Sequence, residues 1–260
     1  GDVYKRQQPG EEVSCYDLLA ALLIPSSCEA ANIIALNVSD SITEFTDLMN
    51  EKAEKLGMEN THFSNAHGLW AQQNYSSCKD MATLCEYAIS KYQVFRDIVC
   101  LPSYHMASTS YHSDGTDIYN TNLMLDSMTD YYYSYVKGIK TGTLDSAGRC
   151  LASYAEYEGT TYLIVTMGAP MDKLEEDVKK GEEDPDSIYG GDNVYYNLLD
   201  HINLYKWAFS SLVATDFVDK NSEVRDVKVS YGDGIDYANL KPANGFTRLW
   251  PVDILSLIHI

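Results

Sequence analysis

The 260-residue chain is poor in basic residues and lacks any long apolar run. Its 19 lysines and arginines are set against 38 aspartates and glutamates, which gives a formal net charge of -19. This balance argues against a nucleic-acid partner, because binding to phosphates needs a basic face and the sequence has none. No apolar stretch reaches the length that spans a bilayer. The hydrophobic share of 45% is nevertheless ordinary for a globular domain with a buried core.

The chain also lacks the spacing of a metal site. Its six cysteines contain no Cys-x-x-Cys pair, and the closest two are Cys78 and Cys85. The histidines show no ligand spacing either, so no metal site is expected. An even number of cysteines permits disulfides, but a chain of this size does not depend on them, and reduced thiols are the favoured interpretation.

Apolar residues recur at helical spacing before Cys100, and strand patterns follow it. The predicted helices are 16–24, 29–37, a segment capped by Ser39 or Asp40 and ended by Gly57, and a segment capped by Ser76 or Ser77. The stretch "GRCLASYAEYEGTTYLIVTMGAP" predicts a hairpin that turns at Glu158 and Gly159. The acidic segment 172–192 is expected to be a solvated loop, and 193–212 a closing helix. A helical block followed by an antiparallel sheet predicts an α+β fold.

Three regions are expected along the chain. Residues 1–15 are interpreted as a non-native or partial N-terminal segment, because "GDVYKRQ" matches no pattern in its neighbours. Residues 16–216 are expected to form the main domain without its N-terminal part. Residues 217–260 begin a fresh β pattern that stops before a domain could be completed.

Lys140, Thr141, Gly142 and Thr143 follow a strand-like run. A lysine that points into a cleft from a strand can hold a substrate carboxylate, and the two threonines can add hydroxyl donors. Gly142 has no Cβ, so a peptide can lie against the strand edge and pair with its backbone. Read alone, the tripeptide Lys-Thr-Gly is explained equally well by a solvated strand end.

Two further motifs precede this tripeptide, "LLIPSSCEAAN" and a run that ends in "NAHGL". In this order the three motifs resemble those of the D-alanyl-D-alanine carboxypeptidases, the low-molecular-weight penicillin-binding proteins, over roughly residues 16–212. The matching residues of the middle motif are Met49, Asn50, Ala53, Leu56, Gly57, Met58, Thr61, Phe63, Asn65, His67, Gly68 and Leu69.

The resemblance implies a β-lactamase/transpeptidase-like fold, in which a helical cluster accompanies an antiparallel sheet whose edge strand carries Lys140. It implies a serine peptidase that removes the terminal D-alanine of peptidoglycan stem peptides through an acyl-enzyme, without a metal or organic cofactor. The expected partner is a stem peptide ending in D-Ala-D-Ala, and β-lactam antibiotics would inhibit the full-length enzyme. The family works outside the cytoplasmic membrane, and a C-terminal segment missing from this chain could attach the protein to it.

The resemblance also assigns roles to residues. Ser26 matches the first serine of the family's Ser-x-Asn motif, whose hydroxyl relays protons, and a helix-cap role after Pro25 is compatible with that. Lys140 and Thr141 would bind the terminal carboxylate of the substrate. Cys28 stands where the family usually has Asn, and a thiol forms weaker hydrogen bonds than an amide, so substrate positioning is expected to differ.

The nucleophile of this family belongs to a Ser-x-x-Lys motif that comes before Ser-x-Asn. Two such strings occur, Ser76 to Lys79 and Ser134 to Lys137, and both come after Ser26. The first is better explained as a helix cap, and the second lies on a predicted strand, where residues i and i+3 face opposite ways. We therefore expect the nucleophile and its lysine to lie upstream of Gly1, and this chain to be inactive by itself.

Other interpretations stay open. A non-catalytic peptidoglycan-binding relative is possible, with Cys28 marking a site released from catalytic constraint. A β-lactamase is less favoured, because of the apparent C-terminal β domain and the missing motif for a deacylating glutamate. His67 is expected to make structural hydrogen bonds, and the tyrosine-rich "DYYYSY" is expected to be a strand with one exposed face.

Overall fold

The computed structural model describes residues 10–184, 186–191, 193–228 and 237–252, so "GDVYKRQ" lies outside the described residues. Internal contacts divide the chain into two units, residues 1–202 and 203–260. The helices and antiparallel strands of the first unit confirm the α+β class. The domain boundary expected near residue 216 stays a prediction.

The four helices predicted in the first half of the chain are confirmed. They are α1 (Cys15–Leu23), α2 (Cys28–Val38), α3 (Ile42–Lys55) and α4 (Cys78–Lys91). Each begins after a serine whose side chain accepts a backbone N–H of the first turn, and these serines are Ser14, Ser27, Ser41 and Ser77. The cap of α3 is therefore Ser41, and not Ser39 or Asp40. The same helix ends as predicted before Gly57, whose φ of +74° suits glycine.

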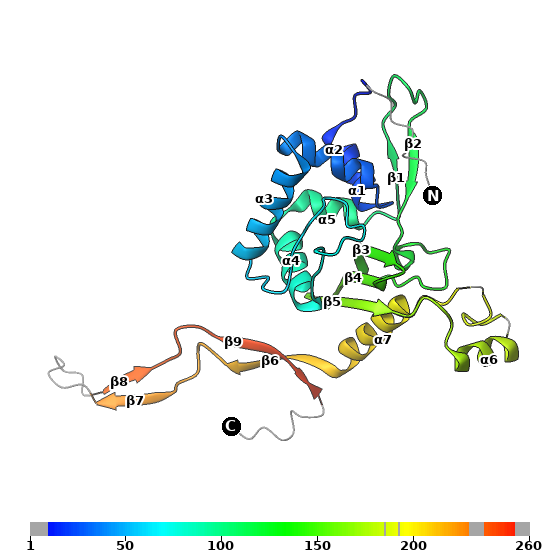
Figure 1. Ribbon diagram of the computed structural model, residues 1–260. Coiled ribbons are helices and arrows are strands. Elements are labelled where there is room, and N and C mark those ends of the chain that lie inside the picture. The colour runs from blue at the N-terminus through cyan, green and yellow to red at the C-terminus, as the bar shows by residue number, and fades with distance from the viewer. Residues whose placement is uncertain (1–9, 185, 192, 229–236, 253–260) are drawn as a thin grey trace. The chain divides into compact units, whose positions relative to one another are not determined.

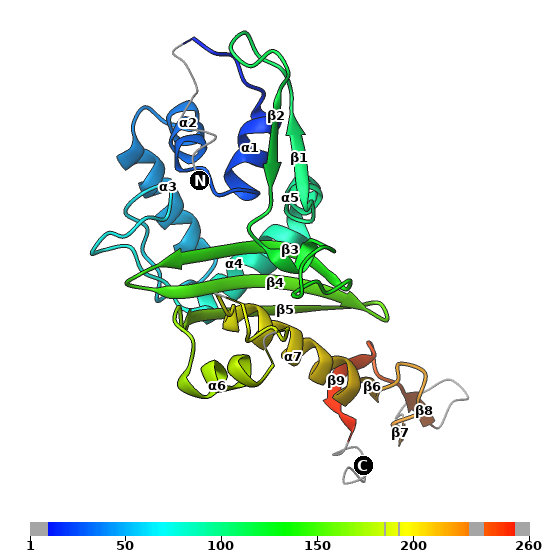
Figure 2. The ribbon, with the colours of Figure 1, turned by 90° about the vertical axis from the view of Figure 1, so that its right-hand side faces the viewer.

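Three antiparallel strands form the sheet that carries the Lys-Thr-Gly motif. They are β3 (Val136–Leu144), β4 (Gly148–Tyr157) and β5 (Thr160–Ala169), and they lie side by side in the order β3-β4-β5 (Figure 2). The hairpin predicted around Glu158 and Gly159 is therefore confirmed as β4 and β5. The expected edge position of Lys140 is also confirmed, because β3 pairs only with β4 among the described strands.

Two helical groups cover opposite faces of this sheet. Ala152 and Tyr154 pack against Cys85 of α4 and Val99 of α5 (Gln93–Val99), a helix that the sequence did not predict. Ser153, which points the other way, contacts His201 of α7 (Tyr196–Ser211). Figure 1 shows α1 to α5 gathered on one side of the sheet.

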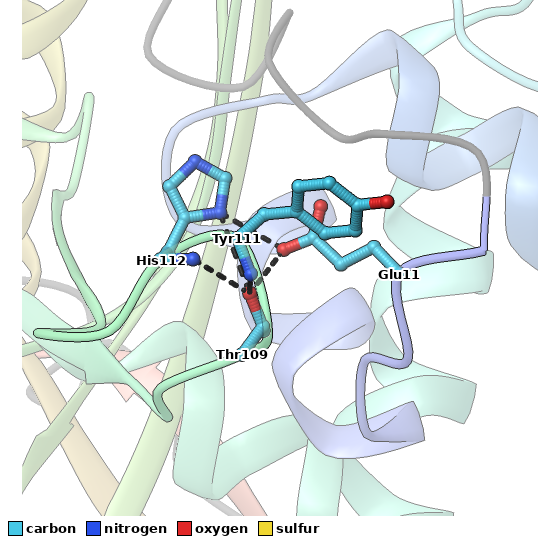
Figure 3. Close-up of polar contacts among 4 residues, drawn as sticks. All are labelled: Glu11, Thr109, Tyr111 and His112. Atoms are coloured by element: carbon cyan, nitrogen blue, oxygen red, sulfur yellow. Dashed lines mark hydrogen bonds and ion pairs between the residues drawn. The ribbon is translucent and has the colours of Figure 1, made fainter.

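A second hairpin connects the helical cluster to the sheet. β1 (Ser103–Met106) pairs with β2 (Thr116–Tyr119), and a short 3-10 helix, η1 (Leu123–Leu125), follows before β3. The loop of this hairpin contacts the N-terminal segment (Figure 3). The Glu11 carboxylate, whose side chain is 3% exposed, accepts a hydrogen bond from the Thr109 hydroxyl and lies 2.9 Å from Nδ1 of His112. Glu11 thereby joins the segment before α1 to the β1–β2 loop.

Two predictions for the second half of the chain are corrected. The acidic segment 172–192 contains a helix, α6 (Glu175–Glu183), because Asp177 is buried and binds Lys180 and the Tyr196 hydroxyl. "DYYYSY" lies in turns before β3 and not on a strand. Tyr133 packs against Tyr135 within this segment, and Tyr131 packs against the distant Tyr195.

The second unit contains the β pattern expected after residue 217. Its strands are β6 (Leu212–Val218), β7 (Arg225–Lys228), β8 (Tyr237–Leu240) and β9 (Phe246–Pro251), with β6 paired to β9 and β7 to β8. Among the described residues, no helix combines the length and apolar character that crossing a membrane requires.

The buried His201 makes the stability of the fold depend on pH. Its Nδ1 lies 2.7 Å from the Ser153 hydroxyl and its Nε2 lies 3.0 Å from the Thr166 hydroxyl. Burial lowers the pKa of His201 from 6.5 to about 3. Between these two pH values the unfolded chain binds a proton that the folded chain does not, so the stability present above pH 6.5 is lost progressively as the pH falls.

We predict that the free energy of unfolding falls by about 2 kcal/mol between pH 7.5 and 5, at about 1.4 kcal/mol per pH unit below 6.5. Urea unfolding at both pH values measures this difference. The variant His201→Gln is the control and loses this part of the pH dependence. An equal pH dependence in both proteins contradicts the assignment.

Candidate active site

Lys140 lies in the middle of β3, and its ammonium has only neutral partners among the described residues. Nζ donates to the Thr121 hydroxyl at 3.4 Å and to the Thr141 carbonyl at 3.3 Å. Burial, without a carboxylate to compensate it, lowers the pKa of Lys140 to about 8. A half-buried cation of this kind is suited to an anionic ligand.

Thr121 links this lysine to the helical cluster. Its hydroxyl lies 2.5 Å from the Thr141 hydroxyl, and its backbone N–H donates to the carbonyl of Ile24 at 3.3 Å. The turn around Thr121 is fixed by Asn120, whose side chain donates to Leu101 and accepts from the backbone of Asn122. The sequence placed "YNTNLML" in the family's order, but it did not identify Thr121 as a site residue.

Ser26 occupies the short connection between α1 and α2. Its φ of +72° lies in the left-handed region that non-glycine residues rarely adopt. The helix-cap interpretation of Ser26 is wrong, because the buried Ser27 accepts the N–H of Ala30 at the start of α2. Ser26 is exposed, and no hydrogen bond of its hydroxyl occurs within the described part of the chain. Non-glycine residues held in this conformation are concentrated at functional sites.

The other predicted site residues flank these two. Cys28 is the half-buried first residue of α2. Gly142 and Thr143 are exposed on β3 and pair with Cys150 and Arg149 of β4. The structure therefore joins Lys140 and Thr141 through Thr121, and it connects Thr121 to the Ser26 loop through Ile24. Direct hydrogen bonds from Ser26 or Cys28 to Lys140 do not occur among the described residues.

An apolar cavity of about 430 Å³ adjoins Lys140 and Thr141. Its walls come from α1, α4, α5 and all three strands of the sheet, and they include Leu23, Leu84, Phe95 and Val165. The Lys-Thr-Gly motif therefore lies at the wall of an apolar cavity.

Neither literal Ser-x-x-Lys string is arranged as a nucleophile and base. Ser77 accepts the N–H of Asp80 as the cap of α4, as predicted, and the Ser76 hydroxyl lies 2.8 Å from that of Thr61. The prediction that Ser134 lies on a strand is wrong, because it lies in the turn before β3, which begins at Val136. In the "NAHGL" loop, Nδ1 of His67 accepts the N–H of Leu69 at 3.2 Å.

The edge strand with Lys140, set beside a helix-to-helix loop that carries Ser26, defines a transpeptidase-like class of protein. Solved structures confirm the fold. A Streptomyces DD-transpeptidase is similar at 30% identity and a TM-score of 0.57 over 64% of each chain. Penicillin-binding protein 5 from Haemophilus influenzae is similar at 22% identity and a TM-score of 0.67, over 94% of this chain and 61% of its own.

A family model described as D-alanyl-D-alanine carboxypeptidase matches residues 2–171. The chain belongs to the D-alanyl-D-alanine carboxypeptidase family, as its three motifs predicted. Among curated relatives, DacF of Bacillus subtilis is 31% identical over 170 residues, and DacC of Escherichia coli is 31% identical over 177. These matches cover 64% of this chain but only 41% and 39% of the relatives, so the chain spans about two fifths of their length.

The left-handed conformation of Ser26 can be tested by substitution. We predict that Ser26→Gly raises the free energy of unfolding by up to about 1 kcal/mol, since the left-handed conformation costs about 1–2 kcal/mol and the extra freedom of glycine costs about 0.5–1. Urea unfolding measures the change. Ser26→Ala, which keeps the strain, is expected to give no gain, and a destabilised Ser26→Gly variant would refute the assignment.

The lowered pKa of Lys140 predicts its chemical reactivity. Its neutral amine should become available with a midpoint near pH 8, whereas an exposed lysine titrates near 10.4. Trace acetylation at graded pH, read by mass spectrometry, compares Lys140 with the exposed Lys55. A midpoint for Lys140 close to that of a free lysine would contradict the burial argument. A carboxylate bound at Lys140 should correspondingly be lost as the pH rises through about 8.

Proposed function

We propose that the protein to which this chain belongs is a serine-type D-Ala-D-Ala carboxypeptidase, which removes the terminal D-alanine of peptidoglycan stem peptides through an acyl-enzyme. Family membership supports this reaction, and the single observation that carries it is the arrangement of Lys140. The ammonium is half-buried on the edge strand, and its hydrogen-bond partners in the described part of the chain are all neutral oxygens. A peptide carboxylate is the complement that such a cation lacks.

The geometry of β3 supports the following mode of substrate binding. The terminal carboxylate would pair with Nζ of Lys140 and accept hydrogen bonds from Thr141 and Thr143. The peptide backbone would pair with the open edge of β3, where Gly142 offers no side chain to obstruct it. Thr121 would hold the side chains of Lys140 and Thr141 in place, since its hydroxyl contacts both. Cys28, at the start of α2, would border the substrate with a thiol in place of an amide.

Ser26 would move protons in this reaction. Its exposed hydroxyl, held by a strained backbone, would carry a proton between the attacking serine and the leaving D-alanine amine. The acyl-enzyme forms when the serine oxygen bonds to the D-alanyl carbonyl carbon and the peptide C–N bond breaks. Water then attacks the ester and releases the shortened peptide.

We further propose that the attacking serine and its lysine belong to a segment outside this chain. In the first internal string Ser77 caps α4 and Ser76 contacts Thr61, and in the second Ser134 lies in a turn before β3. An apolar segment that entered the cavity beside Lys140 would cover its walls and bring a serine to the substrate carbonyl. β-Lactams would acylate that serine, and the enzyme would act outside the cytoplasm, secreted or attached to the membrane.

A fluorescent penicillin tests this account. We predict no covalent band when the 260-residue chain is incubated with it and run on a denaturing gel. A longer protein that also carries an upstream Ser-x-x-Lys is expected to be labelled and to release D-alanine from a peptide ending in D-Ala-D-Ala. In that protein, Lys140→Ala should lower kcat/KM about 10- to 100-fold, the effect of one charged hydrogen-bond partner.

Two controls separate the alternatives. Ser76→Ala should leave the longer protein labelled, because Ser76 supports a loop and not the reaction. If the 260-residue chain itself is labelled and Ser76→Ala abolishes the band, the proposed absence of the nucleophile is wrong.

A further inference from the structure

A second cavity of about 430 Å³ lies on the α4 and α5 face of the sheet, at its hairpin end. Its walls come from the end of α4, from α5, and from the cross-strand pairs Tyr154–Leu163 and Glu156–Thr161 of β4 and β5. The cavity beside Lys140 is lined instead by residues 165–167 of β5. The apolar core that contains Ile89, Phe95 and Leu163 lies on this same face of the sheet.

The most buried polar side chain of this cavity is Tyr154. The residue is 4% exposed, yet its hydroxyl has no hydrogen-bond partner within the described part of the chain. Burial raises the pKa of Tyr154 to about 12, so the hydroxyl keeps its proton and remains a donor at neutral pH. The hydroxyl is not among the fully buried polar atoms that lack a partner in the described residues, so it opens onto the cavity and can donate a hydrogen bond to a ligand there.

Charges of both signs line the same cavity. Arg96 donates through Nη1 to the carbonyl of Ile89 and through Nη2 to the side chain of Gln93, which are both neutral acceptors. A guanidinium has five N–H donors, so more than two remain for a ligand. Glu86 and Glu156 contribute carboxylates, and neither forms an ion pair with Arg96 among the described residues.

We propose that this cavity is a binding site for a small zwitterion, a free amino acid or a dipeptide. The ligand's carboxylate pairs with Arg96 and accepts a hydrogen bond from the Tyr154 hydroxyl. The ligand's ammonium lies between Glu86 and Glu156. The volume is within the range of about 300–1,000 Å³ that is typical of small-molecule sites. A simple anion or a simple cation would contact groups of only one sign in this cavity, whereas a zwitterion contacts both.

Titration of the ¹⁵N-labelled 260-residue chain with L-alanyl-L-alanine tests the site. We expect saturable shifts in the backbone amides of Ser90, Arg96, Tyr154 and Thr161. N-acetyl-L-alanyl-L-alanine lacks the ammonium and L-alanyl-L-alanine amide lacks the carboxylate. Each is expected to bind about tenfold more weakly, the effect of losing one charge-assisted contact.

Two variants locate the binding. Binding should weaken about tenfold in Glu156→Gln, a change at an exposed residue. It should weaken by the same factor in Tyr154→Phe, which removes only the hydroxyl. Lys140→Gln should leave the dissociation constant unchanged, which separates this site from the proposed substrate site. If Tyr154→Phe does not fold, Glu156→Gln and the two capped dipeptides still decide the question.

Three results would overturn the proposal. The first is chemical-shift changes that do not saturate. The second is equal affinity for the capped and uncapped dipeptides. The third is binding that Lys140→Gln weakens and Glu156→Gln leaves unchanged.

Discussion

The β3–β4 ladder is the constraint on which the candidate site depends. Pairing from Val136 to Leu144 fixes the direction of β3 and leaves its other edge open among the described strands. That pairing sets Lys140 opposite Ala152, on the face that α4 and α5 cover, where the ammonium is half-buried. A change in register by one residue would turn Lys140 to the α7 face and separate the motif from the cavity.

Thr121 connects this strand to the rest of the unit. Its backbone N–H binds Ile24 at the end of α1, and its hydroxyl contacts Thr141 and Lys140. The connection runs from the helix that precedes Ser26 to the strand that carries the lysine. One residue therefore connects, through its backbone and its side chain, two motifs that are more than a hundred residues apart in the sequence.

The sequence predicted those features that follow from local periodicity and from ordered motifs. Four capped helices, the β4–β5 hairpin and the edge position of Lys140 are confirmed. Helix α5 was missed because its seven residues are too few to show a clear apolar period. Helix α6 was missed because its stability comes from tertiary contacts of the buried Asp177, which composition does not reveal.

The site shows the same division. The motif order located Ser26, Cys28 and Lys140, but the roles of Ser26 and Ser27 could not be separated, because either serine could cap the helix that follows. Thr121 was not identified, since its importance comes from contacts with residues far away in the sequence. The Tyr154 hydroxyl, for which no hydrogen-bond partner occurs in the described part of the chain, is a feature of the packed cavity that the sequence does not indicate.

The most direct test of the central claim is an NMR titration of the 260-residue chain with an N-acylated peptide ending in D-Ala-D-Ala. The acyl group removes the ammonium, so this ligand is not suited to the second cavity. The account predicts saturable shifts in the amides of Thr121 and of Lys140 to Thr143, which disappear in Lys140→Gln. Saturable binding that leaves these amides unchanged, or that persists in Lys140→Gln, would contradict the assignment of β3 as the substrate edge.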